Sequence, residues 1–181
     1  MAAPAPGAVR PATACPASGA SLVEGNHQAI DVREAVDVVL RIVEPQLASK
    51  RLDSVADIPP DVRVVADPER LRGILLTLVS NAIRFTEPGG HVMIDVGYPE
   101  GMPEDVVMIR VGDSGCGIST ERQQEIFEAS APARHPAESN AGGTGPGLVN
   151  SRRWAREMGG DLRVRSDVDR GSVFTLKLPR G

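Results

Sequence analysis

Four segments of the sequence combine polar residues and glycines in patterns that could hold a phosphate compound and its metal ion. In the first segment, Asn81 can offer an amide oxygen to a hard cation such as Mg²⁺, which prefers oxygen ligands. Arg84, less than one helical turn further on, can contact phosphate oxygens. Both side chains would lie along one edge of the same helix, so the spacing predicts a shared site.

The second segment is Asp113-Ser-Gly-Cys-Gly-Ile118, which directly follows an apolar run. A carboxylate at this position can accept a hydrogen bond from an adenine amino group, whereas guanine presents an acceptor there and should be repelled. Gly115 and Gly117 have no side chains, so a flat base could approach the backbone. The same six residues also fit a tight turn without a ligand.

The third and fourth segments are neighbours in the chain. Between Ala129 and Gly147 the sequence has no large aliphatic or aromatic residue, so this stretch is expected to be mobile. It ends in Gly142-Gly-Thr-Gly-Pro-Gly147 at the start of a predicted helix, where backbone N–H groups favour phosphate. Each signal alone is weak, because a glycine-rich stretch before a helix is more often an ordinary loop.

The composition limits the kind of protein that carries these segments. Its 181 residues are 41% hydrophobic and 24% charged with a formal net charge of −4, as expected for one globular domain. A net acidic chain argues against nucleic-acid binding through bulk charge, and no apolar run is long enough to span a membrane. Cys15 and Cys116 are too few for a disulfide framework. We therefore predict a cytoplasmic protein without direct membrane contact.

Hydrophobic periodicity predicts the helices that position the four segments. Helical spacing predicts one helix over residues 33–48 and a second that begins after Asp67, with Pro68 in its first turn. On the second helix, Thr77, Asn81 and Arg84 border an apolar face. That face comprises Leu71, Ile74, Leu75, Leu78, Val79, Ala82 and Phe85.

Strands are predicted at residues 52–58, 62–65, 91–98 and 106–111, and a closing hairpin at 161–166 and 172–178. The run at 106–111 is almost continuously apolar, which is expected of a central strand covered on both faces. A short helix would begin with a capping box at Thr120 and Gln123, and a last helix would span residues 147–158. Strands interleaved with three helices predict an α/β two-layer sandwich.

The N-terminal stretch differs from the rest in composition. Of its first 21 residues, 14 are Ala, Pro or Gly, and such a segment buries too little apolar surface to offset its ordering entropy. We expect a disordered tail over residues 1–28 and a folded domain over residues 29–181.

The four segments resemble the motifs of one known family. Asn81-Ala-Ile-Arg-Phe-Thr86 is similar to its N box, Asp113-Ser-Gly-Cys-Gly-Ile118 to its G1 box, Ile126-Phe127-Glu128 to its F box, and Gly143-Thr-Gly-Pro-Gly-Leu148 to its G2 box. Together they resemble the ATP-binding catalytic domain of sensor histidine kinases, most of all the hybrid type. The superfamily also includes gyrase-type topoisomerases, mismatch-repair MutL and a heat-shock chaperone. The likeness covers about residues 29–179.

This resemblance implies the Bergerat fold, a mixed sheet with three helices on one face and a mobile ATP lid, here residues 129–142. It implies catalytic roles for Asn81, as a Mg²⁺ ligand, and for Arg84, at the phosphates, and it places adenine at Asp113. The remaining residues that it assigns to nucleotide binding are Gly115, Gly117, Ile118, Phe127, Gly143, Thr144, Gly145, Gly147 and Leu148.

The resemblance also implies the reaction and its partners. ATP would donate its γ-phosphoryl group to a histidine on a separate dimerisation domain, and the group would then pass to the receiver domain of a response regulator. Ser21-Leu-Val-Glu-Gly25 resembles the last turn of such a dimerisation helix, as expected of a kinase separated just after its acceptor domain. His27, His91 and His135 lack the helical neighbours of a phosphoacceptor. We therefore expect a histidine supplied in trans and a monomeric chain.

Four positions depart from the family pattern, among them Ser130, which replaces the second Phe of the F box. Thr77 stands where hydrolysing members carry Glu and most kinases carry Asn, and a threonine cannot activate water as a base at neutral pH. Pro146 replaces a leucine and lacks an N–H, and Asn150 replaces an apolar residue. Two alternatives to the histidine kinase stay open: a degenerate nucleotide-binding regulatory module, and a serine kinase of the anti-sigma-factor type.

Overall fold

The computed structural model of the chain describes residues 26–98, 105–128 and 146–181. Its strands are β1 (Gln28–Asp31), β2 (Asp53–Asp57), β3 (Arg63–Ala66), β4 (His91–Gly97), β5 (Val106–Asp113), β6 (Asp161–Asp167) and β7 (Gly171–Pro179). Its helices are α1 (Val32–Lys50), α2 (Pro68–Phe85), α3 (Arg122–Glu125) and α5 (Pro146–Glu157). The predicted elements agree with these boundaries to within a few residues, whereas β1 was not predicted.

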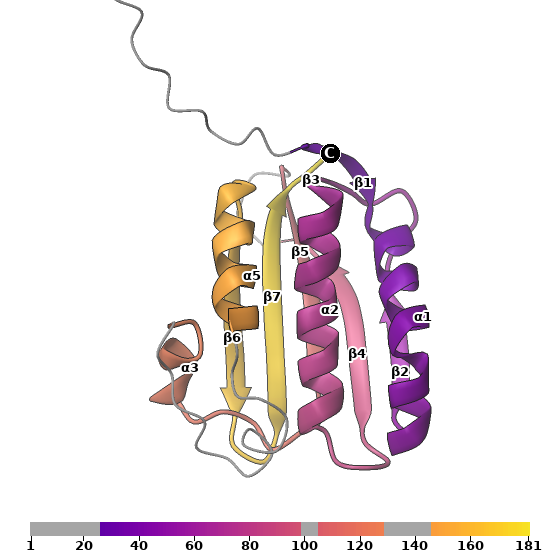
Figure 1. The fold of residues 1–181 in the computed structure, drawn as a ribbon, viewed down its shortest axis with the longest axis vertical. Helices are drawn as coiled ribbons and strands as arrows, with labels where there is room; N and C mark the ends of the chain where they lie inside the picture. The colour runs from indigo at the N-terminus through magenta and orange to yellow at the C-terminus, as the bar shows by residue number, and fades with distance from the viewer. Residues whose placement is uncertain (1–25, 99–104, 129–145) are drawn as a thin grey trace, which may run out of the picture.

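The molecule is built as two layers, a mixed sheet and the helices that cover one of its faces. The sheet has the strand order β2-β4-β5-β7-β6, in which β2 is parallel to β4 and the other neighbours are antiparallel. Helices α1, α2 and α5 lie side by side on one face of this sheet (Figure 1). A separate two-stranded sheet pairs β1 with β3. The predicted two-layer α/β sandwich with a mixed sheet is therefore confirmed.

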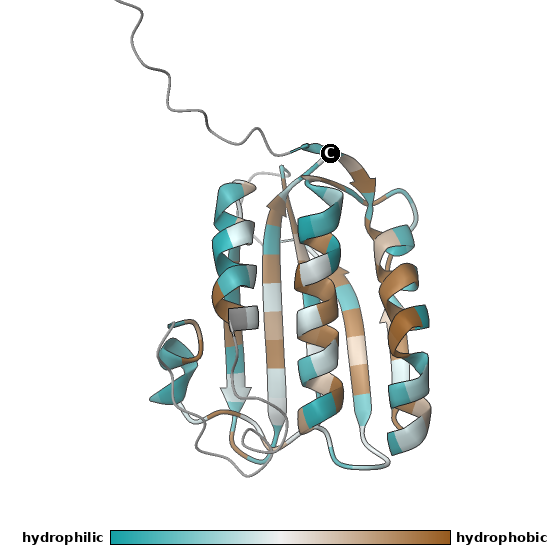
Figure 2. Cartoon of the chain, viewed as in Figure 1, coloured by the Kyte–Doolittle hydropathy of each residue, from teal (hydrophilic) through white to brown (hydrophobic). Residues whose placement is uncertain are grey.

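Helix α2 begins as its sequence predicts. The Asp67 side chain accepts hydrogen bonds from the backbone N–H groups of Glu69 and Arg70, each at 3.0 Å, and Pro68 occupies the first turn. These contacts satisfy N–H groups that have no partner within the helix. Hydrophobic and hydrophilic residues alternate around α1 and α2 in Figure 2, which is the pattern of helices with one buried face.

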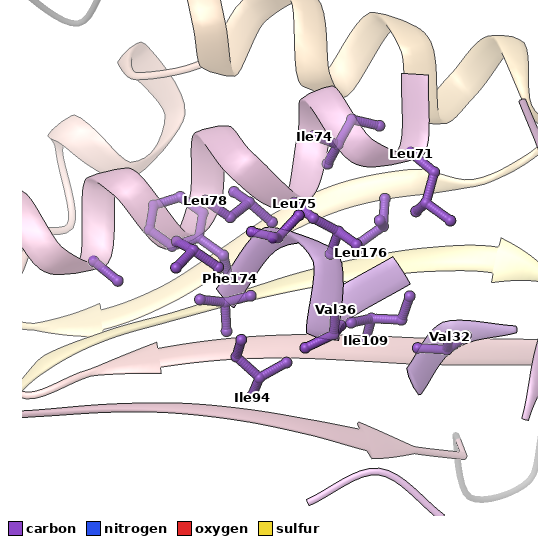
Figure 3. Packing of buried hydrophobic residues seen from close by; sticks show 14 of the residues in the cluster. Val32, Val36, Leu71, Ile74, Leu75, Leu78, Ile94, Ile109, Phe174 and Leu176 are labelled. Atoms are coloured by element: carbon purple, nitrogen blue, oxygen red, sulfur yellow. The ribbon is translucent and has the colours of Figure 1, made fainter. Parts of the chain in front are cut away.

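The core lies between α1, α2 and the covered face of the sheet. Figure 3 shows Leu75 and Leu78 of α2 above Phe174 and Leu176 of β7, and all four are at most 5% exposed. Close packing also joins α2 to α5, since a Cβ atom at Gly73 would lie 2.9 Å from the Trp154 ring. Large aliphatic residues therefore fix α2 against the centre of the sheet, and a glycine lets α5 approach it.

Two local predictions are wrong. The central strand β5 is covered on one face only: Val107, Ile109 and Val111 are buried, whereas Met108 and Arg110 on the other face are partly exposed. The uncovered face also carries apolar residues, so the sequence at 106–111 is almost continuously apolar although only one face is buried.

The predicted capping box before α3 is also absent. Helix α3 has no side-chain cap, and the Gln123 amide instead donates to the backbone carbonyls of Ile118, at 3.0 Å, and Ser166, at 2.7 Å. Gln123 thus links the short helix to β6 by a hydrogen bond. The spacing of nearby residues in the sequence does not indicate such a long-range contact.

Gln28, one residue before the predicted start of the folded domain, pairs with Ala66 in the β1–β3 sheet. Residues 1–25 of the expected tail, and the expected lid at 129–142, lie outside the described residues. Within the part of the chain that is described, no helix has the length and apolar character that a bilayer crossing requires.

Asp161, at the start of β6, anchors the end of α5. Its carboxylate oxygens lie 3.3 Å from Arg152 Nε, 3.2 Å from Arg156 Nε and 3.1 Å from Arg163 Nε. Burial would raise the pKa of Asp161, but the hydrogen bonds of the three arginines and the charge of Arg152 together lower it. The ionised carboxylate therefore stabilises the folded state.

We expect Asp161→Asn to reduce the free energy of unfolding at pH 7 by about 1 kcal/mol, the scale of a partly exposed ion pair. Because the folded pKa is lowered, this stabilisation is present above the ordinary value of 3.8 and disappears as the pH falls below it. Urea unfolding of parent and variant between pH 3 and 7 measures the difference. Asp57→Asn, on the exposed edge strand β2, is the control. A difference in the free energy of unfolding that does not depend on pH would contradict stabilisation by the ionised Asp161 carboxylate.

Candidate functional site

A cavity lies at the end of the sheet where α2 and β5 end and α5 begins. Figure 1 shows how these elements are arranged. Segments that are far apart in the sequence meet around the cavity. Its lining residues are Asn81, Phe85, Asp113, Cys116, Gly117, Ile118, Arg122, Ile126, Leu148, Ser172 and Phe174. Most of the lining is apolar, with a few polar groups, which is the usual character of a small-molecule site.

Asp113 is the acidic group of this cavity. It is the last residue of β5 and lies opposite Ser172 of β7, so the sheet itself fixes its position. Burial raises the pKa of the Asp113 carboxyl, and hydrogen bonds from the backbone N–H groups of Gly115 and Ser172 partly oppose that rise. The Gly115 N–H donates to Oδ1 over 2.9 Å, so one oxygen is held while the carboxylate keeps further acceptor capacity for a ligand donor.

The two glycines after Asp113 are required by close backbone contacts. A Cβ at Gly115 would lie 2.4 Å from the Phe85 carbonyl oxygen, and one at Gly117 would lie 2.0 Å from the Asp167 carbonyl oxygen. Gly117 also has a φ of +70°, a backbone conformation that residues with a side chain rarely adopt. The segment can therefore pack between the end of α2 and the β6–β7 turn only because these side chains are absent.

Helix α2 supplies Asn81 and Phe85 to the cavity, one turn apart. The sequence pattern placed Phe85 on the apolar face of this helix. In the structure Ile83 is buried there, at 3% exposure, while the Phe85 ring faces the cavity. Thr77, one turn before Asn81, donates its hydroxyl hydrogen to the Gly73 carbonyl over 2.8 Å.

Five of the predicted site residues line the cavity: Asn81, Asp113, Gly117, Ile118 and Leu148. Four others are next in sequence to lining residues but are not part of the lining: Arg84, Gly115, Phe127 and Gly147. The Arg84 guanidinium stacks 5.1 Å from the Phe85 ring centre, and the Phe127 ring lies beneath Arg152 at 4.8 Å. Gly147 packs against Thr77, whose methyl carbon would be 3.1 Å from a Cβ there. Gly143, Thr144 and Gly145 lie outside the described residues.

Arg122, Ser172 and Phe174 are lining residues that sequence reasoning missed. Arg122 opens α3, whereas Ser172 and Phe174 come from β7, about sixty positions beyond Asp113 in the sequence. The predicted closing hairpin contained both β7 residues, but only the pairing of β5 with β7 shows that they lie beside Asp113.

Comparison with known proteins agrees with this geometry. The family model described as "Histidine kinase-, DNA gyrase B-, and HSP90-like ATPase" matches residues 66–181. The sensor protein GacS of Pseudomonas syringae pv. syringae is 36% identical over 154 residues, covering 83% of this chain and 17% of GacS. The aerobic respiration control sensor protein ArcB of Escherichia coli K12 is 38% identical over 143 residues, covering 77% of this chain and 18% of ArcB. The chain thus spans less than a fifth of either relative.

Solved structures show the same fold. The catalytic domain of histidine kinase ThkA, in a nucleotide-free form, superposes with a TM-score of 0.73 at 27% identity, covering 86% of this chain and 98% of that one. Full-length ShkA in complex with AMPPNP superposes with a TM-score of 0.74 at 27% identity, covering 90% of this chain and 33% of that one.

Burial of the Asp113 carboxylate should oppose folding. We expect Asp113→Asn to be at least as stable as the parent at pH 7, because the amide is uncharged and its oxygen can still accept from Gly115. The folded pKa lies above the ordinary 3.8, so the parent loses stability relative to the variant as the pH rises through the folded pKa. Denaturant unfolding at several pH values measures this difference in stability between variant and parent. A variant whose stability relative to the parent is lower at pH 7 than at pH 3 would contradict the prediction.

The close contact at Gly117 gives a second prediction. We expect Gly117→Ala to destabilise the fold by roughly 3 kcal/mol, through a positive φ and a clash with the Asp167 carbonyl. Gly89→Ala is the matched control, because Gly89 has a φ of +82° but nothing within 4 Å of the added atom. This control should cost only about 1 kcal/mol. Equal losses in thermal unfolding would show that the contact at Gly117 is unimportant.

Proposed function

The chain belongs to the histidine kinase-, DNA gyrase B- and HSP90-like ATPases, and from this membership we propose that residues 29–181 form the catalytic domain of a histidine protein kinase. The domain binds ATP with Mg²⁺ and transfers the γ-phosphoryl group to a histidine on a separate phosphoacceptor domain. The single observation that carries the proposal is the half-buried carboxylate of Asp113 at the end of β5, in the lining of a mostly apolar cavity.

In this proposal the adenine lies in the cavity with its amino group toward Asp113. The acceptor capacity of the carboxylate suits that amino donor, and an apolar lining that includes Ile118 and Leu148 suits the flat faces of the base. Gly115 and Gly117 let the segment after Asp113 pack against the Phe85 and Asp167 carbonyl groups, which positions this wall of the cavity. Asn81, also in the lining, would meet the phosphate end of the nucleotide.

The residues at the cavity fit a magnesium ion that arrives with the nucleotide. Among the described residues, no group of three or more His, Cys, Asp or Glu could hold a metal by itself. Asn81 offers one neutral oxygen, and Mg²⁺ commonly binds one or two protein oxygens while keeping waters and substrate phosphate oxygens. Mg²⁺ when bound would neutralise phosphate charge, and Arg84 would add a positive charge near the same end of α2.

The phosphoacceptor histidine would come from another domain. In the described parts of the chain the histidines are His27, which precedes β1, and His91, which begins β4; neither lies in a helix. His135 lies outside those parts. Transfer would break the bond between the γ-phosphorus and its bridging oxygen, release ADP and form a phosphorus–nitrogen bond. The phosphoryl group would then pass to the receiver domain of a response regulator.

A regulatory module that binds nucleotide without transferring phosphate is the second candidate. Thr77 supports it, because its hydroxyl hydrogen is already donated to Gly73 and the residue offers no amide oxygen for a second metal contact. The arrangement of Asn81 and Asp113 around one cavity favours the kinase.

We expect Asp113→Asn to lose ATP binding by at least about tenfold in Kd while staying folded, because the amide would place a donor opposite the adenine amino group or lose a charge-assisted acceptor. Calorimetric titration of Mg-ATP into parent and variant measures this. Asp167→Asn, an exposed carboxylate at the end of β6, is the matched control and should bind like the parent. Unchanged affinity in Asp113→Asn would remove Asp113 from the site.

Phosphotransfer is tested with ATP labelled on its γ-phosphate and phosphoacceptor domains of histidine kinases, added separately. We expect label on the acceptor that is stable to alkali and labile to acid, as a phosphorus–nitrogen bond requires, and none with Asn81→Ala. Label that is stable to acid would indicate serine as acceptor. ATP binding without transfer to any acceptor domain would favour the regulatory module.

A further inference from the structure

Lys50, the last residue of α1, makes an unusual set of contacts with the end of α2. Its ammonium nitrogen lies 2.9 Å from the Ile83 carbonyl oxygen, 2.8 Å from that of Arg84 and 3.0 Å from that of Thr86. Thus all three ammonium hydrogens can be donated to backbone oxygens of one short segment. This is a polar link between two helices whose buried residues are apolar.

The end of a helix needs such donors. The last carbonyl groups of α2 have no partner within the helix, and they carry the negative end of its dipole. The ammonium group satisfies two of these acceptors, at Ile83 and Arg84, together with the Thr86 carbonyl just after the helix, and it has the favourable sign of charge. Thr86 completes the helix end, since its hydroxyl and its N–H both donate to the Ala82 carbonyl, over 2.7 and 3.1 Å.

The segment that Lys50 holds is also the wall of the cavity. The Phe85 carbonyl, between two of the bound carbonyls, accepts a hydrogen bond of 3.4 Å from the N–H of Cys116. Phe85 and Cys116 both line the cavity. A shift of residues 83–86 would therefore move an aromatic wall and the glycine segment after Asp113 together.

The backbone of Lys50 strengthens the same link. Its carbonyl accepts from the Gly89 N–H over 3.1 Å, so the turn after α2 is tied to the end of α1. The turn is also tightly packed, because a Cβ at Gly90 would lie 2.4 Å from the Thr86 methyl and 2.7 Å from Ser114 Oγ. Ser114 follows Asp113 directly, which connects this turn to the opposite side of the cavity.

We propose that Lys50 is a positioning residue for the nucleotide site: its ammonium group fixes the last turn of α2 and, through the Phe85 carbonyl, the wall that receives the adenine. This inference rests on the proposed function for its effect on nucleotide binding. It adds a residue from α1 that does not line the cavity.

The test compares Lys50→Met, which keeps the length of the side chain but removes its charge, with Lys50→Arg and with Arg41→Met. Arg41 is exposed on the same helix, so its variant controls for the loss of one positive charge. We expect Lys50→Met to raise the Kd for both ATP and ADP by about tenfold, measured by calorimetry well below the unfolding temperature. Because the effect acts at the base, the ratio of the two Kd values should stay at the parent value.

Lys50→Arg should raise both Kd values by less, since it keeps the charge but a planar guanidinium cannot direct three donors to converging carbonyls. Arg41→Met should bind like the parent. A purely structural role would lower the unfolding temperature of Lys50→Met but leave the affinity of the folded protein unchanged, and that result would overturn the proposal. A loss confined to ATP would also overturn it, because it would indicate an action at the phosphates.

Amide hydrogen exchange provides a readout that does not need a nucleotide. Lys50→Met should speed exchange at the amides of Thr86 and Cys116, whose hydrogen bonds depend on the end of α2, with little change in β6 and β7. If the parent binds no nucleotide, the proposed function fails, and exchange alone then judges the positioning role. Unchanged exchange at these two amides would overturn it. Should Lys50→Met not fold, Lys50→Arg is judged by the same two amides.

Discussion

The half-buried carboxylate of Asp113 is the constraint on which the rest of the site depends. Removing a carboxylate from water is unfavourable unless it is hydrogen-bonded, and here the compensation comes from the backbone N–H groups of Gly115 and Ser172. Those donors are correctly placed only if β5 ends at Asp113 and β7 pairs with it in the observed register. The register of β5 and β7 therefore also determines the position of the Asp113 carboxylate.

The packing around that group explains why the site lies at this end of the sheet. Helices α2 and α5 approach each other at Gly73 and Trp154, and both direct their cavity residues toward the end of β5. The end of α2 contacts the glycines after Asp113 so closely that a Cβ at Gly115 would collide with the Phe85 carbonyl. Lys50 supplies the positive charge that this concentration of helix-end carbonyls requires. The contacts beside the cavity stabilise the fold, and the desolvation of the Asp113 carboxylate offsets part of that stabilisation.

Much of this fold could be predicted from local sequence signals. Asp67 and Pro68 define the start of α2, the apolar spacing defines its buried face, and the strands and closing hairpin follow from alternation and turn residues. The identity of five cavity residues followed from the motifs. What local signals could not give was the pairing of β5 with β7, and with it Ser172 and Phe174, because strand order depends on contacts between distant segments. The same reason accounts for Gln123, whose long-range bond to β6 replaced a predicted cap.

Nucleobase selectivity tests the central claim, that the Asp113 carboxylate recognises the base, most directly. Mg-ATP and Mg-GTP carry the same phosphates and metal and differ at the edge that would face Asp113. In calorimetric titration of the unmodified chain we predict heat of binding with Mg-ATP and none with Mg-GTP, since guanine would set an acceptor against the carboxylate. Equal affinity for the two nucleotides would mean that the phosphates alone are bound, and would contradict the assignment of Asp113 as the group that selects adenine.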